Sequence, residues 1–103
     1  MRLFILAAPL VLAGCIDTCS EAKIYDAVKA SVSADLRAPG SAVFPPLDRT
    51  TLTRSGSACS FSAQGHVDAQ NNFGALVRMN YSALALRSTS GEYRAEVTSI
   101  TQR

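Results

Sequence analysis

The chain has 103 residues, a formal net charge of +2 and a charged-residue content of 17%. No block of charged residues is long enough to form the basic stripe of a nucleic-acid-binding domain, so we expect no nucleic-acid partner. The length suits one domain without internal repeats, and so small a core would gain stability from a covalent cross-link.

The N-terminal residues are interpreted as an export signal. Arg2 precedes an apolar run from Leu3 to Leu12, too short for a membrane-spanning helix, which needs roughly 20 residues. The run ends in Leu12-Ala13-Gly14-Cys15, with small residues before the cysteine, as suits a signal peptidase. This string resembles the lipobox of bacterial lipoproteins, which implies cleavage before Cys15 and acyl chains on that cysteine. The alternative is an ordinary secretory peptide with a chance cysteine.

This interpretation divides the chain into a signal peptide over 1–14, a lipidated tether over 15–19 and a single domain over 20–103. The membrane is then one partner, contacted through the acyl chains on Cys15. In some lipoprotein families an aspartate directly after the cysteine retains the protein at the inner membrane. Ile16 stands there, which favours the outer membrane facing the periplasm, although lineages that read the next position would use Asp17 for retention.

A helix is predicted after the tether. Thr18-Cys19-Ser20-Glu21 has the pattern of a capping box, with Ser20 as a competing N-cap, and Pro39-Gly40 is expected to end the helix. Its apolar residues recur every three to four positions and form one stripe, which we interpret as a core face. The stripe consists of Ile24, Tyr25, Val28, Val32 and Leu36.

Cys19 and Cys59 are the two cysteines that lipidation leaves over. In an exported protein such a pair predicts a disulfide, and closing a loop of about 40 residues stabilises by about 4 kcal/mol in the chain-entropy model. A helix that begins after Ser20 would let Cys19 turn inward, so the disulfide favours that start. The alternatives are two free thiols, or Cys59 as a plain core residue. The cysteine and histidine spacings match no metal site, and no cofactor is expected.

Three extended segments are predicted around a central hairpin. Val43 to Pro46 is a proline-stiffened connector, and a threonine-rich strand is expected near Thr50 to Arg54, turned by Ser55-Gly56-Ser57. A last strand, Glu92 to Thr101, follows the turn at Ser88-Thr89-Ser90-Gly91. Its inward residues would be Tyr93, Ala95 and Val97.

The central hairpin is predicted from alternation. Small or apolar residues alternate with polar ones from Cys59 to Val67, and alternation resumes from Phe73 to Ala85, with the turn formers Asp68 to Asn72 as the loop. Pairing Val67 with Phe73 puts the apolar residues of both strands on one face. In that register Cys59 lies beside Tyr81, Arg78 lies opposite Ser62, and the small residues Ala63, Gly65 and Ala75 make room for the helix.

Together these elements predict an α+β fold: one N-terminal helix packed on a four-stranded antiparallel β-meander. The strings Leu36 to Pro45 and Gly65 to Arg78 are similar to a group of small uncharacterised bacterial domains, over roughly Val28 to Ile100. Members of that group often carry a cysteine near the position of Ser82 or Ala83, which this chain lacks, so no disulfide transfers from them. The resemblance implies the fold and no activity.

Function is expected to be binding rather than catalysis. His66, Asp68 and Arg78 share an outer face and could suggest acid–base chemistry, but no nucleophile motif, phosphate loop or metal cluster accompanies them. We therefore expect a monomeric, lipid-anchored envelope interaction module whose partner is another envelope protein or a small ligand. The alternative is an exclusion lipoprotein of a prophage or mobile element that blocks a receptor or transfer channel. The expected interaction surface comprises Gln64, His66, Asp68, Asn71, Asn72, Arg78 and Asn80.

Overall fold

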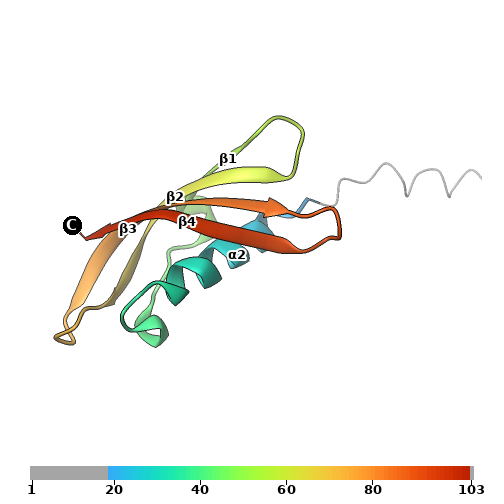
Figure 1. Ribbon diagram of the computed structural model, residues 1–103. Helices are drawn as coiled ribbons and strands as arrows, with labels where there is room; N and C mark the ends of the chain where they lie inside the picture. Colours follow the sequence, from blue (N-terminus) through green and yellow to red (C-terminus); the bar gives the residue numbers. More distant parts are fainter. Residues whose placement is uncertain (1–18, 103) are drawn as a thin grey trace, which may run out of the picture.

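The computed structural model describes residues 19–102, so the signal peptide, Cys15, Ile16, Asp17 and Thr18 lie outside the described residues. One helix packs against one face of a four-stranded antiparallel sheet in the order β1-β2-β3-β4, which confirms the α+β meander (Figure 1). The helix is α2 (Glu21–Ala34), followed by the 3₁₀ turns η1 (Pro39–Ser41) and η2 (Leu47–Arg49), and the strands are β1 (Thr51–Arg54), β2 (Ser60–Gln70), β3 (Leu76–Arg87) and β4 (Tyr93–Gln102).

The helix begins after Ser20, the later of the two predicted starts. The Ser20 hydroxyl accepts a hydrogen bond from the Lys23 N–H at 3.3 Å, which satisfies one of the free donors of the first turn. The expected end at Pro39-Gly40 was wrong, because α2 stops at Ala34. The Asp35 N–H bonds to the Val32 carbonyl at 3.0 Å, a tighter turn that closes the helix before the proline.

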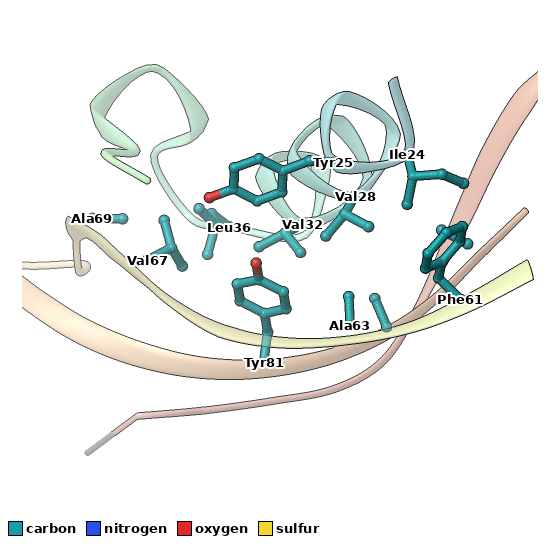
Figure 2. Packing of buried hydrophobic residues seen from close by; sticks show 12 residues of the cluster. Ile24, Tyr25, Val28, Val32, Leu36, Phe61, Ala63, Val67, Ala69 and Tyr81 are labelled. Carbon is teal, nitrogen blue, oxygen red and sulfur yellow. The ribbon is translucent and has the colours of Figure 1, made fainter. Parts of the chain in front are cut away.

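The core lies between α2 and the sheet (Figure 2). All five residues of the predicted helix stripe are buried, including Leu36, which lies beyond the helix end. They meet the inward side chains of β2 and β3, and the partly buried Tyr93, Ala95 and Val97 of β4 pack against the same core, as expected. The buried strand residues are Phe61, Ala63, Val67, Ala69, Tyr81, Ala83 and Ala85.

The predicted register of the central hairpin was wrong by six residues. Val67 pairs with Met79 instead of Phe73, and Gly65 instead of Cys59 lies opposite Tyr81. Since six is an even number, every residue of the paired strands still faces the predicted side of the sheet. The helix therefore packs on the expected face, while each cross-strand neighbour differs.

The turn explains the error. β2 continues through Asp68 to Gln70, and the chain reverses over 71–75 rather than over Asp68 to Asn72. The Asn71 side-chain oxygen accepts hydrogen bonds from the N–H groups of Phe73 at 2.9 Å and Ala75 at 3.1 Å, and Gly74 adopts a positive φ of 80°. An Asx turn closed by a left-handed glycine fixes this position. Phe73 and Ala75 consequently lie in the exposed turn instead of beneath the helix.

Candidate functional site

The outer face of the sheet, opposite α2, gathers the predicted polar residues. His66 pairs with Asn80 across β2 and β3, and Asp68 pairs with Arg78. Gln64, the next outward residue of β2, lies opposite Ser82. The structure thus places the five predicted strand residues in adjacent positions, while Asn71 and Asn72 lie beyond them at the turn.

Asp68 and Arg78 form a bidentate ion pair across the two strands. Arg78 Nε lies 2.8 Å from Asp68 Oδ1, and Arg78 Nη2 lies 3.0 Å from Oδ2. The hydrogen bond from Arg78 holds the pKa of Asp68 below its usual value, and the same contact raises the pKa of Arg78. Asp68 is therefore a strand residue paired with a counter-ion, which corrects its expected place at the start of the loop. Arg78 lies opposite Asp68 instead of Ser62 because of the six-residue change in register.

The Asp68–Arg78 ion pair also limits the chemistry open to His66, Asp68 and Arg78. Asp68 is held as a carboxylate by the guanidinium, and within residues 19–102 no hydrogen bond joins it to His66. A histidine that acts as a general base usually has its ring oriented by such a bond. His66 and the Asp68–Arg78 pair thus lie side by side on the outer face as polar groups, with the carboxylate already engaged by the guanidinium.

Phe73, which the sequence interpretation placed in the core, stands at the tip of the β2–β3 hairpin with 93% of its surface exposed. Two backbone hydrogen bonds to the Asn71 side chain, one of them from Phe73 itself, and the positive φ of Gly74 define the turn that carries it. The signal for this was available: Asn71-Asn72-Phe73-Gly74 has an Asx-turn residue first and glycine last. The alternating pattern obscured this turn signal, because Phe73 stands two residues before Ala75 and four before Val77 and so looks like one more inward residue of β3.

Further apolar side chains are exposed near this tip. Val43 forms an isolated bridge with Asp68 at the margin of the sheet, its N–H donating to the Asp68 carbonyl at 2.8 Å. Leu76, opposite Gln70, is the first residue of β3. Both are exposed, and they lie on either side of the strand that carries Asp68. The hairpin end thus combines an aromatic tip, two aliphatic side chains and one ion pair.

The outer face also has two shallow hollows. A polar one of about 400 Å³ lies over the middle of the sheet, beside Gln64, His66 and Asn80. A more apolar one of about 460 Å³ lies over β3 and β4, bordered by Leu84 and Leu86, which are 54% and 44% exposed. Leu84 lies opposite Glu96 and Leu86 opposite Arg94, so both leucines face outward.

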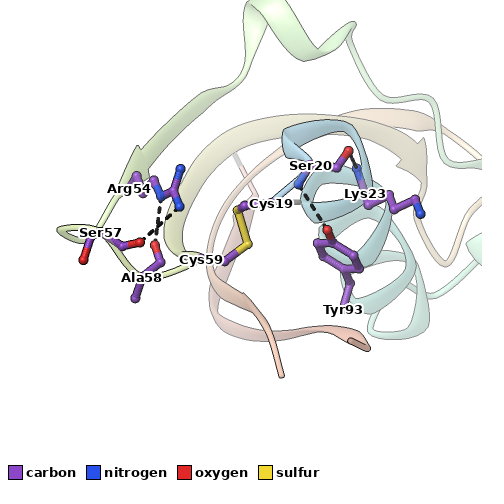
Figure 3. The surroundings of a disulfide bond; sticks show 8 residues. All are labelled: Cys19, Ser20, Lys23, Arg54, Ser57, Ala58, Cys59 and Tyr93. Atoms are coloured by element: carbon purple, nitrogen blue, oxygen red, sulfur yellow. Dashed lines mark hydrogen bonds between the residues drawn. A yellow bond between two sulfur atoms is a disulfide. The ribbon is translucent and has the colours of Figure 1, made fainter. Parts of the chain in front are cut away.

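The opposite end of the sheet holds the predicted disulfide (Figure 3). Cys19 and Cys59 are bonded, with their Cα atoms 5.6 Å apart, and the Tyr93 hydroxyl accepts a hydrogen bond from the Ser20 N–H at 3.1 Å. These contacts tie the first described residues to β4 and to the segment before β2.

No metal or membrane-spanning feature appears in the described part of the chain. Over residues 19–102 no three metal-binding side chains gather at one point, and no helix there has the length and apolar character needed to cross a membrane.

Comparisons with known proteins add no identification. No family model matches the chain. Searches of curated proteins and of solved structures likewise find no match.

Proposed function

We propose that this chain is a lipid-anchored binding module of the bacterial envelope and that its protein partner contacts the β2–β3 hairpin tip and the adjoining outer face. The observation that carries the proposal is Phe73, an aromatic side chain exposed on a turn with a fixed backbone. Large aromatic residues supply much of the binding energy at protein interfaces, because they bury a large area with few rotatable bonds.

The fixed turn supports a binding role. A flexible loop must be ordered on association, which costs about 0.5–1.5 kcal/mol for each side chain that is immobilised. Here the Asn71 side chain and Gly74 already define the turn, so less ordering remains for the backbone. The Asp68–Arg78 pair next to the tip adds charge that would favour one orientation of a partner over another.

The proposed lipid anchor would orient the hairpin tip relative to the membrane. In this proposal residues 1–14 are removed, Cys15 carries the acyl chains, and the short tether to Cys19 holds the disulfide end near the outer membrane. Figure 1 shows the β2–β3 hairpin tip at the far end of the sheet from the start of α2. The tip would therefore point away from the membrane and into the periplasm, where a partner could reach it.

Crosslinking in living cells tests the proposal. A photoreactive residue at position 73 of the full chain should yield a discrete protein adduct, whereas the same residue at Thr53, exposed on β1, should not. Adding Arg78→Glu to the position-73 variant should reduce the adduct, since it places two carboxylates face to face. Equal labelling from positions 73 and 53, or no adduct from position 73, would refute a contact at the tip.

A further inference from the structure

β4 forms a long open edge of the sheet. Among the described elements it pairs with β3 alone, and it runs for ten residues, Tyr93–Gln102, without a proline. The other edge is protected: β1 has four residues and is preceded by Pro45 and Pro46. Natural sheets usually shorten, bend or charge an exposed edge because it can pair with another strand. β4 carries a bulge at Thr98 and two charged residues, but from Tyr93 to Val97 it pairs regularly with β3 and has no neighbour on its other side among the described elements, so this stretch can accept a partner strand.

The hydrogen bonds between β3 and β4 show which backbone groups of β4 point to the open edge and can pair with another strand. The Ser88 N–H donates to the Glu92 carbonyl at 2.7 Å, and on the other side of β3 the Arg87 N–H donates to the Cys59 carbonyl at 2.9 Å. Because inward and outward pairs alternate along antiparallel strands, the backbone groups of Arg94 and Glu96 point toward β3. Those of Ala95 and Val97 point away from it, to the open edge.

The charges of β4 and the length of the ladder together favour one way of pairing this edge with a copy of itself. Arg94 and Glu96 both lie on the outer face and are both exposed. Arg94 Nη2 contacts Glu92 Oε1 of its own chain at 2.8 Å, but both side chains are well exposed, so exchanging this pair for one with Glu96 of a second copy costs little. An antiparallel pairing centred on Ala95 sets Ala95 opposite its own copy and uses the free backbone groups of Ala95 and Val97. It also places Arg94 opposite Glu96 of the second copy, and this happens twice because the arrangement is symmetric. Opposite charges facing each other across strands are stabilising.

The neighbouring registers are less favourable. A pairing centred on Tyr93 also sets Arg94 opposite Glu92 of the copy, but it reaches the turn over 88–91 two residues from the axis, so its ladder is shorter. A pairing centred on Arg94 brings two arginines together and sets Glu92 opposite Glu96 of the copy, while one centred on Glu96 brings two glutamates together. Like charges directly opposite are destabilising. A register in which the two-fold axis passes between two residues of β4 would set inner-face residues opposite outer-face ones. Directly opposed residues of antiparallel strands always lie on the same face, so such registers are not possible.

We propose that two copies of this chain associate through β4, antiparallel and centred on Ala95, so that one continuous sheet crosses the two-fold axis. On the inner face Tyr93 then lies opposite Val97 of the second copy, which extends the apolar layer across the interface. This proposed dimer differs from the monomer expected from the sequence. The alternation of apolar and polar residues indicates which side chains face the core, but it does not show which strand lies at the edge of the sheet. The proposed dimer does not depend on the lipid anchor or on the hairpin tip.

Register-specific disulfide formation tests the geometry in the full chain. Two differently tagged copies, one with Arg94→Cys and one with Glu96→Cys, are co-expressed and oxidised in the envelope. The proposed register predicts a mixed dimer, and much less dimer from Arg94→Cys with itself, since those positions lie two residues out of step. Only monomers, equal yields from both combinations, or capture of a different protein at this edge would overturn the proposal.

Charge reversal provides an independent check of the two-fold pairing. Arg94→Glu or Glu96→Arg alone should abolish the dimer detected by chemical crosslinking of the full chain, whereas the double variant should restore it. Arg49→Glu, an equal charge change on η2, serves as the control and should leave the dimer intact. Equal thermal unfolding curves show that the variants fold. A dimer that survives both single reversals, or that the double variant does not restore, contradicts the proposal.

Discussion

Gly65 and Tyr81 lie opposite each other on β2 and β3, and the absence of a side chain on the glycine leaves room for the tyrosine ring. A Cβ at position 65 would lie 2.9 Å from Tyr81 Oη and 3.3 Å from Thr50 Cγ2. Figure 2 shows the Tyr81 hydroxyl pointing from the sheet toward the helix, where Tyr25 lies. Glycine at position 65 thus allows the Tyr81 ring to lie in the core.

Gly65→Ala should therefore destabilise the domain. Overpacking of a well-filled core costs about 1–3 kcal/mol, and the free energy of unfolding in urea would measure it. Gly40→Ala is the matched control, because a Cβ at that position meets nothing within 4 Å. A cost for Gly65→Ala no larger than that for Gly40→Ala would show that Tyr81 can move aside.

The Tyr81 hydroxyl predicts a dependence on alkaline pH. Burial raises its pKa to about 12, and within the described residues Tyr81 Oη has no hydrogen-bond partner. Above pH 10 the unfolded chain loses this proton while the folded chain keeps it, so stability falls as the pH rises from about 10 to about 12. Tyr81→Phe should match the wild type or exceed it in stability at pH 7 and should lose less stability over that range. Parallel decline of the two unfolding midpoints from pH 9 to pH 11 would argue against it.

At the scale of elements, the faces of the strands were predictable and their register was not. Alternation assigned Phe61, Ala63 and Val67 to the core side, because a side chain's face depends only on whether its position is odd or even. Any even shift of the hairpin preserves those faces, so alternation cannot choose among them. Asn71 and Gly74 make that choice through turn geometry. The polar surface was foreseen for the same reason, whereas Phe73 was misplaced because it continues the apolar phase of β3.

Asn71→Ala should weaken the hairpin turn, and Asn72→Ala should not. The Asn71 side chain accepts two backbone hydrogen bonds, each of which contributes about 0.5–1.5 kcal/mol, while Asn72 is exposed at the neighbouring position. Faster amide hydrogen exchange at Phe73 and Ala75 in Asn71→Ala would report the loss. If both variants exchange as the wild type does, the side chain is not what holds the turn.

At the scale of the molecule, the Cys19–Cys59 bond joins the helix start to the sheet. The two residues are 40 apart, and constraining a loop of this length stabilises by about 4 kcal/mol in the chain-entropy model. A variant with both cysteines changed to serine should lose stability of that order, measured by the unfolding midpoint. Reduction of the wild-type protein should have a comparable effect. A double variant as stable as the oxidised protein would show that the core alone suffices.

The proposed anchor is tested at position 15. Cys15→Ser in the full chain should abolish acyl labelling and leave an uncleaved precursor, since the thiol that would carry the lipid is gone. Cys59→Ser is the control that also removes a cysteine, here one of the disulfide, and should keep the label. Wild-type protein that is cleaved normally and has the intact mass of an unmodified chain would rule the anchor out.

The disulfide also turns the segment from Cys19 to Cys59 into a closed covalent ring. A protease that cuts once inside that ring, for example at the exposed turn around Gly56, opens the loop without releasing either half. β3 and β4 would remain connected to everything that precedes Cys19. The domain can thus be nicked on that side and still stay attached to its N-terminal segment, whereas a single cut after Cys59 sets the C-terminal strands free of any covalent link.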